Sequence, residues 1–303
     1  MSSKTLYISI VIAFFFVHEA GAQHTSTYQD TTRRSLSKIL ENVKTKIESD
    51  KLYLKMSEEE IIRKADSLPA FSVFKDNYFI SGVSLNEKIN SETADVKYQI
   101  SIRHRLTKSL LPFNTFLYMT YTQKSFWNLY AKSAPFRDNN YNPGLGVGRY
   151  IIVNNQLTGA TFLQLEHESN GQNDEQSRDI NLISFSGKYF FTNNLSIKFK
   201  VSVPFLMGEN NEDILDYRGT GNFALDYKTR NDKWWFSGAV SPKKSVKSAN
   251  VTLSAGYKVS DRFNQYLFGE FYSGTGDSML DYRKRDLKFR VGMCIKPDFY
   301  NVF

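Results

Sequence analysis

A period-two alternation of apolar and polar side chains constrains the fold of this chain more than any other feature of its sequence. It recurs from about residue 77 to residue 295 in segments of about ten residues, which clusters of Asn, Asp, Gly, Lys and Ser separate. In "NLISFSGKYFF", Ile183, Phe185 and Tyr189 share one face of a strand. Ser184 and Ser186 lie on the other face. One face suits lipid and the other suits a polar lumen.

Twelve segments carry this pattern, and an even number of strands is typical of bacterial single-chain barrels. They are residues 77–84, 95–106, 114–125, 143–154, 159–169, 178–191, 195–204, 220–228, 233–240, 249–259, 262–273 and 286–295. The expected fold is all-β, a transmembrane antiparallel β-barrel of about twelve strands with a short N-terminal helical extension.

A soluble β-sandwich would show a similar alternation. Three features favour the barrel: an export signal in a chain with one cysteine, Tyr and Phe near the segment ends, and a terminal aromatic residue, Phe303. The single cysteine, Cys294, excludes an internal disulfide, so a disulfide-stapled secreted domain is excluded as well.

The N-terminal region predicts two segments before the barrel. Residues 1–22 read as a secretory signal peptide, with Lys4 in the charged region and Ala22 at the cleavage site. Residues 23–70 predict a periplasmic, partly helical extension, in which Ser57 caps "EEEIIRKA" and Pro69 ends the helix. The barrel domain is then expected over residues 71–303, in the outer membrane of a Gram-negative bacterium.

The net charge of +8 raises the question of an anionic partner. The basic residues are scattered among strands and turns instead of forming one patch. An exported chain of this kind is not expected to bind nucleic acid.

The stretch "LEHESNGQ" places two chemically active side chains on one strand face. His167 and Ser169 are two residues apart, in line with Leu165, and this face is expected to meet lipid. A hairpin centred near Asp174 sets Asn181 opposite His167. Ser169 as nucleophile, His167 as general base and Asn181 as the group that orients the imidazole form one interpretation. The alternative is that these are interfacial polar residues at a strand end.

Four stretches resemble the outer membrane phospholipase A family, in the family's order. They are "YTQKSFW" at 121–127, "SAPFRDNNYNP" at 133–143, "HESNGQNDEQSRDIN" at 167–181 and "FYSGTGDSMLDYR" at 271–283. The resemblance extends from about Phe71 to Phe299 and leaves the extension out. It implies a twelve-stranded barrel that hydrolyses phospholipid acyl esters with a lipid-facing triad of Ser169, His167 and Asn181. The backbone N–H of Gly171 would contribute to the oxyanion hole.

The same resemblance implies calcium as cofactor and a homodimer as the active form. The matching ligands are the Ser177 hydroxyl, the Gln172 backbone carbonyl and Ser133 of the partner subunit. A second calcium site of the family uses Asp174 with a carboxylate from a later loop. Asn210 stands at that later position here, which leaves the second site open.

Two further points stay open at this stage. A non-catalytic porin or adhesion barrel is the alternative function, and it offers no reason for the three triad residues to lie in register. Gln123 faces either the lumen or lipid, and the family analogy places it in the dimer interface. Acyl-position preference, headgroup preference, the physiological trigger and the role of residues 23–70 cannot be read from the sequence.

Overall fold

The computed structural model describes residues 57–244, 248–261 and 263–298. The predicted signal peptide and the extension up to residue 56 lie outside the described residues, so the domain boundaries remain predictions. None of the helices in the described ranges is long and apolar enough to cross a bilayer.

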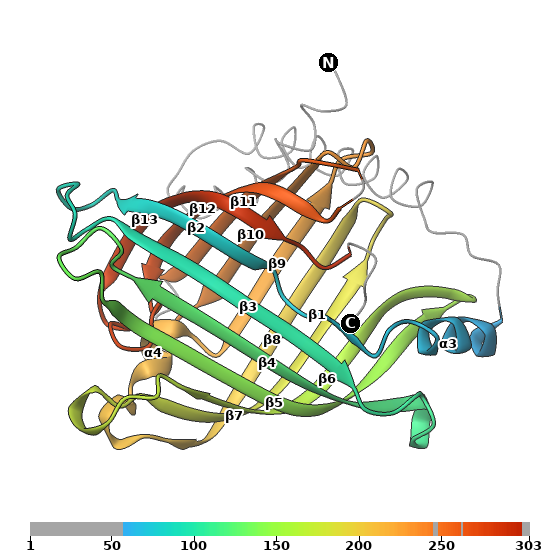
Figure 1. Ribbon diagram of the computed structural model, residues 1–303. Helices are drawn as coiled ribbons and strands as arrows, with labels where there is room; N and C mark the ends of the chain where they lie inside the picture. The colour runs from blue at the N-terminus through green and yellow to red at the C-terminus, as the bar shows by residue number, and fades with distance from the viewer. Residues whose placement is uncertain (1–56, 245–247, 262, 299–303) are drawn as a thin grey trace, which may run out of the picture. The chain divides into compact units, whose positions relative to one another are not determined.

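A 13-stranded antiparallel sheet makes up most of the described chain (Figure 1). Its strands β2 to β13 close on themselves through the β13–β2 pairing, which gives a barrel of twelve strands. The strands are β1 (Phe71–Val73), β2 (Asn77–Ser84), β3 (Asp95–Arg105), β4 (Thr115–Trp127), β5 (Phe136–Val153), β6 (Gln156–Ser169), β7 (Asp179–Phe190), β8 (Leu195–Met207), β9 (Gly221–Lys228), β10 (Trp234–Pro242), β11 (Ala249–Lys258), β12 (Gln265–Thr275) and β13 (Arg285–Ile295).

Each of the twelve predicted segments corresponds to one barrel strand, so the predicted fold is confirmed. β1 pairs with β3 alone and precedes the closed ring. β5 differs most from the prediction, because it begins at Phe136 instead of residue 143. Its first residues are polar on both faces: Asp138 and Asn140 are buried inside, while Arg137 is exposed. Without an apolar face, this part of the strand shows no alternation.

The barrel interior combines a buried apolar and aromatic cluster, which includes Phe116, Phe162 and Ala65 of α3, with paired charged side chains. Lys97 lies 2.8 Å from both Glu270 and Asp277, and Arg290 lies 2.7 Å from Asp95. All of these side chains are buried. Because a buried charge is costly unless it has a partner, such pairs make a packed polar core feasible inside the ring of strands.

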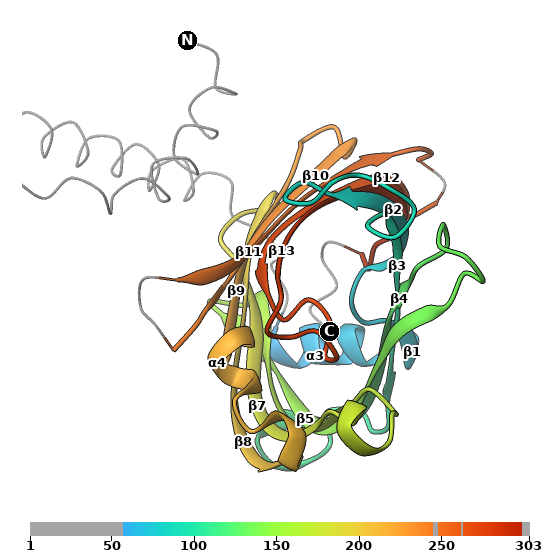
Figure 2. The ribbon, with the colours of Figure 1, turned by 90° about the vertical axis from the view of Figure 1, so that its left-hand side faces the viewer.

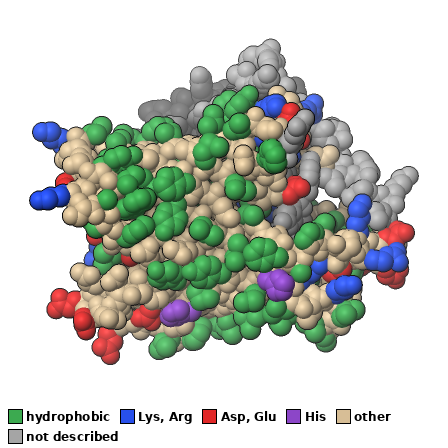
Figure 3. Space-filling model, viewed as in Figure 1, with side chains coloured by type: hydrophobic (Ala, Val, Ile, Leu, Met, Phe, Trp, Pro, Cys, Tyr) green, Lys and Arg blue, Asp and Glu red, His purple; other side chains and the backbone are tan. Residues whose placement is uncertain are grey.

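The outer surface is apolar along the strands (Figure 3). Leu163 and Leu165 on β6 and Ile183 and Phe185 on β7 are exposed, and charged side chains gather toward the ends of the face shown. This arrangement is typical of a barrel whose belt meets lipid. Gln123 belongs to the same outer surface, since it pairs across the sheet with the exposed Ile100. The lipid-facing alternative for Gln123 is therefore confirmed.

Helix α3 (Glu58–Asp66) lies within one mouth of the barrel (Figure 2). Ser57 and Glu60 form the reciprocal capping box that the sequence predicts. Arg105, at the end of β3, donates to the carbonyl oxygens of Ala65 at 2.9 Å and Asp66 at 2.7 Å. The Ala65 carbonyl also accepts from the Leu68 N–H, whereas among the described residues the helix end leaves the Asp66 carbonyl without a partner of its own. The two bonds from Arg105 fix α3 to the barrel wall.

The two ends of the barrel carry different connections. Short turns, such as residues 154–155 and 191–194, lie at the end that holds α3. Longer loops, such as residues 170–178, 208–220 and 276–284, lie at the opposite end. Bacterial barrels have short periplasmic turns and long extracellular loops, so the 170–178 end is the extracellular one.

Candidate active site

Strands β6 and β7 bring the three predicted side chains to one place. His167 pairs directly with Asn181 across the two strands, and Ser169 pairs with Asp179. His167 is exposed on the outer face together with Leu165, while Glu166 points inward. The predicted face and the predicted register are both confirmed.

The His167 imidazole is held by the amide of Asn181. Its Nδ1 lies 3.0 Å from Asn181 Oδ1. Because Oδ1 is an acceptor, Nδ1 carries the hydrogen in this pair and Nε2 is left with its lone pair. In the described part of the chain no hydrogen bond joins His167 to Ser169. The Ser169 hydroxyl instead accepts from the backbone N–H of Gly171 at 3.1 Å.

Gly171 occupies a backbone position that suits glycine alone. Its φ of +67° lies in the left-handed region, and an added Cβ would meet the Tyr141 ring at 3.0 Å. Tyr141 is the β5 residue that pairs with Ser169. The conformation turns the Gly171 N–H toward the Ser169 hydroxyl, which it reaches at 3.1 Å.

Asn170 braces the loop that follows Ser169. It is 1% exposed, and its Nδ2 donates to the Gln176 carbonyl at 2.8 Å. Its Oδ1 accepts from the N–H groups of Gln172 at 3.3 Å and Arg178 at 2.9 Å. The Asn-Gly dipeptide reads as a simple turn in the sequence, so this bracing role was missed.

Three loops contact one another at the extracellular end of the barrel: residues 170–178, 208–220 and 276–284. Tyr282 donates its hydroxyl hydrogen to Asp213, and Arg283 lies 2.9 Å from the same carboxylate. Hydrogen bonds from Arg283 and then Tyr282 lower the pKa of Asp213. Burial, helped by the bond to Asp213, raises the pKa of Tyr282 to about 12. The Arg178 guanidinium lies 5.9 Å from the centroid of the Tyr282 ring, so the contact reaches the loop after Ser169.

Asn211 extends the β7 ladder from a separate loop. Its buried side chain accepts from the Asp179 N–H at 3.1 Å and donates to the Asp179 carbonyl at 2.9 Å. Asp179 is two residues before Asn181, so the Asn211 amide acts as an extra strand partner for the start of β7. No local pattern indicates this contact, because the two residues are 32 positions apart.

We expect Asn211→Ala to loosen the start of β7. The Asp179 N–H loses its partner, and an unsatisfied buried group costs about 1–3 kcal/mol. Hydrogen exchange of the amides at 178–181 should therefore accelerate by roughly tenfold or more. The exposed neighbour Asn210 supplies the control, since Asn210→Ala leaves Asp179 untouched. Equal exchange rates in the two variants would refute the bracing role.

The residues matched to calcium ligands keep their oxygens free. Among the described residues, the Ser177 hydroxyl, the Gln172 carbonyl and the Ser133 hydroxyl accept no hydrogen bond. Ser177 and Gln172 share loop 170–178, whereas Ser133 is exposed on the loop between β4 and β5. Free, uncharged oxygens on exposed loops fit a hard cation such as calcium. No cluster of three or more His, Cys, Asp or Glu side chains forms a metal site in these same ranges.

Asp174 and Asn210 do not form a comparable pair. Asn210 Nδ2 donates to the Asp174 backbone carbonyl at 2.8 Å. The amide therefore presents a donor to loop 170–178 and occupies one of its oxygens. The second calcium site at Asp174 therefore stays a prediction.

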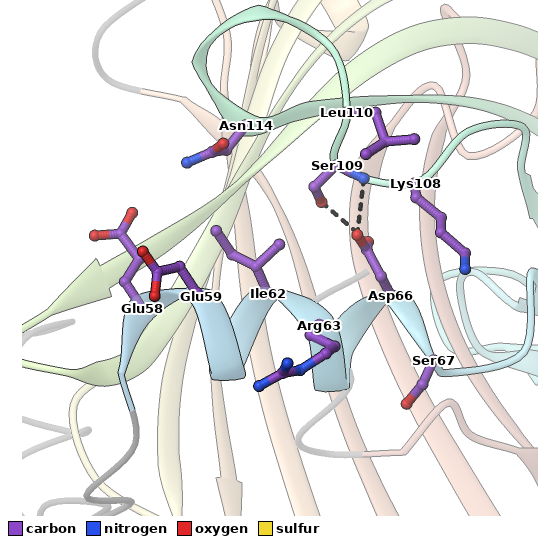
Figure 4. Close-up of a pocket in the computed structure, with 10 residues that line it drawn as sticks. All are labelled: Glu58, Glu59, Ile62, Arg63, Asp66, Ser67, Lys108, Ser109, Leu110 and Asn114. Carbon is purple, nitrogen blue, oxygen red and sulfur yellow. Dashed lines mark hydrogen bonds between the residues drawn. The ribbon is translucent and has the colours of Figure 1, made fainter.

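A pocket of about 630 Å³ lies at the opposite end of the barrel, between α3 and the 106–114 loop (Figure 4). Its lining includes Ser109, whose hydroxyl donates to Asp66 at 3.0 Å. Its lining contains no histidine. Ser109 is committed to a carboxylate, and the other serine, Ser67, donates to the Lys64 carbonyl at 2.7 Å. The pocket offers no activated nucleophile, so the candidate site is the β6–β7 end.

The family model described as Phospholipase A1 matches residues 45–295. Phospholipase A1 of Klebsiella pneumoniae is 28% identical over 216 residues, which covers 69% of this chain and 73% of that protein. Phospholipase A1 of Escherichia coli K12 is 28% identical over 223 residues, with 69% and 72% covered.

Two solved structures share the fold. Outer membrane phospholipase A from Escherichia coli superposes with a TM-score of 0.67 at 24% identity, covering 76% of this chain and 99% of that one. The Salmonella typhi outer membrane phospholipase dimer with bound calcium gives a TM-score of 0.68 at 23% identity, covering 82% and 100%.

Proposed function

We propose a function that proceeds from two facts. The chain belongs to the phospholipase A1 family, and it is a β-barrel of the Gram-negative outer membrane. The proposed reaction is calcium-dependent hydrolysis of the acyl esters of glycerophospholipids, of the A1, A2 and lysophospholipase types. The observation that carries it is the 3.0 Å bond between His167 and Asn181 beside Ser169 on the lipid-facing surface.

In the proposed mechanism, Ser169 Oγ attacks the ester carbonyl while His167 Nε2 takes its proton. Asn181 Oδ1 accepts from Nδ1–H and so holds the tautomer in which Nε2 is a base. The same imidazole then returns the proton to the leaving alkoxide. Water hydrolyses the acyl-serine, with His167 again as base, and releases the fatty acid.

The position of the Gly171 N–H supports its proposed role as a donor that stabilises the developing oxyanion. It already points to Ser169 Oγ at 3.1 Å, which is the atom that bonds to the carbonyl carbon. A preorganised donor at this place acts mainly on the transition state, which is where charge develops on the former carbonyl oxygen.

Calcium, where bound, would supply a Lewis acid that polarises the ester and its oxyanion. Ser177, by its hydroxyl, and Gln172, by its carbonyl, would hold it from one subunit. Ser133 from a second copy would add another oxygen, so the active form is proposed to be a homodimer. The proposal covers one calcium site and does not extend to a second site at Asp174.

An uncharged orienting residue suits this location. An unpaired carboxylate next to lipid carries a large desolvation cost, whereas an amide does not. The carboxylates on either side of His167 in the sequence point inward and are paired, Glu166 with Lys200 at 2.7 Å and Glu168 with Arg218 at 2.8 Å.

Asn181→Ala is expected to reduce hydrolysis by about tenfold to a hundredfold, less than loss of the nucleophile. Water can replace part of the hydrogen bond to Nδ1 but does not fix the imidazole. Asn173→Ala is the matched control, since Asn173 is an exposed asparagine of the loop that precedes β7. Initial rates on mixed micelles test this prediction. Equal rates in the two variants would remove Asn181 from the mechanism.

The proposed function is tested by assaying detergent-folded protein on phospholipid, with and without a calcium chelator. Fatty-acid release that requires calcium supports the proposal. A folded barrel that releases none at any calcium concentration would favour the alternative, a non-catalytic porin or adhesion barrel.

A further inference from the structure

Strand β8 carries an irregularity directly beside the candidate triad. Asn181 pairs with Leu206 and the next β7 residue, Leu182, pairs with Pro204. Phe205 is therefore an extra residue without a partner on β7. Such bulges bend a strand and redirect side chains, and they are common next to active sites.

The bulge places two consecutive apolar side chains on the outer face. Along β8 the alternation is regular up to Val203, with Ser202 buried inside. At the bulge, Phe205 is 58% exposed and Leu206 is 62% exposed. A regular strand would have turned one of the two into the lumen. The lipid-facing surface thus gains an additional large side chain at the position level with Asn181.

From this position an apolar surface runs away from the triad along β7 and β8. Ile183 pairs with Val203 and Phe185 pairs with Val201, and all four side chains are exposed. This surface is continuous with the belt that meets lipid. A lipid whose ester bond lies at Ser169 has its acyl chains on the membrane side of that bond, which is the direction in which this surface extends.

We propose that Phe205 and Leu206 form the contact surface for one acyl chain of the bound phospholipid and so set a preference for long chains. This inference rests on the proposed function and adds the β7–β8 side of the triad to it. The occupant is an acyl chain because the surface is apolar, begins level with Asn181 and continues into the lipid-facing belt.

The test compares substrates that differ in acyl-chain length. For wild type, Phe205→Ala, Leu206→Ala and the double variant, kcat/KM is measured on diacyl phosphatidylcholines with 8-carbon and 16-carbon chains in mixed micelles. We expect the preference for the longer chain to fall roughly tenfold in the double variant, which is the low end of the effect of one methylene in a hydrophobic pocket, about 10–200-fold. Leu253→Ala is the matched control, because it shortens an exposed side chain of the outer face on β11, which β9 and β10 separate from β8.

Each outcome decides the inference. A fall in the chain-length ratio in the bulge variants, with the ratio kept in Leu253→Ala, supports it. An unchanged ratio overturns it, and so does a fall that is matched by loss of crosslinked dimer, since the surface would then contact a second copy. Heat-modifiable gel migration confirms that each variant is folded. If wild type cleaves neither substrate, the proposed function fails; if wild type is active but the ratio does not move, the acyl-chain surface alone fails.

Discussion

Ser169→Ala and His167→Ala are each expected to lower the rate of phospholipid hydrolysis by at least about 10³-fold. Alanine at 169 removes the attacking oxygen, and alanine at 167 removes the group that takes its proton. Because the members of a triad act as one unit, the double variant should lose little more than either single variant. Initial rates of fatty-acid release in saturating calcium provide the measurement.

The fold should be unaffected by these changes. Both side chains project from the outer face, and neither packs in the barrel interior. Heat-modifiable migration should therefore match wild type. Ser273→Ala, which removes a hydroxyl from the outward row of β12, is the matched control and should keep full activity. A Ser169→Ala protein with near wild-type rates would remove Ser169 as the nucleophile.

Calcium withdrawal is expected to abolish hydrolysis, and Ser133→Ala is expected to raise the calcium concentration for half-maximal activity by roughly tenfold or more. Calcium takes 6–8 oxygen ligands. In the proposed site, Ser177 and Gln172 would supply two uncharged oxygens from one subunit, and Ser133 of the partner subunit would add a third. The measurement is a calcium titration of the hydrolysis rate.

A ligand shared in this way would couple metal binding to association. Calcium should increase crosslinked dimer for wild type more than for Ser133→Ala. Ser91→Ala, an exposed serine on the loop between β2 and β3, controls for loss of a loop hydroxyl. Full activity of an uncrosslinked monomer with unchanged calcium demand would disprove the shared site.

The strands could be predicted wherever one face is apolar. In β6 and β7 the outward rows around Leu165 and Ile183 make the alternation visible, and the register of the hairpin follows from its centre near Asp174. The prediction held because the ladder continues without a shift up to the pair of Ser169 and Asp179. The start of β5 could not be predicted, because both of its faces are polar there.

Features that depend on distant contacts left no local signal. Asn211 reaches Asp179 from another loop, and its surroundings, "GENNED", read only as a polar connection. The β8 bulge lies in the apolar run "VPFLM", where neither face can be distinguished and an extra residue cannot be seen. The Asn170 hydrogen bonds could not be predicted, because an Asn-Gly dipeptide is also a strong signal for an ordinary hairpin turn.

The central claim is that Ser169 is the nucleophile of a calcium-dependent esterase on the barrel surface. The most direct measurement is reaction of the detergent-folded protein with an alkylsulfonyl fluoride, followed by mass spectrometry of the modified peptide. We predict one sulfonyl group, on Ser169, formed in the presence of calcium and lost in both His167→Ala and chelated wild type. Modification of another serine, or labelling of Ser169 at the same rate without calcium and without His167, would contradict the claim.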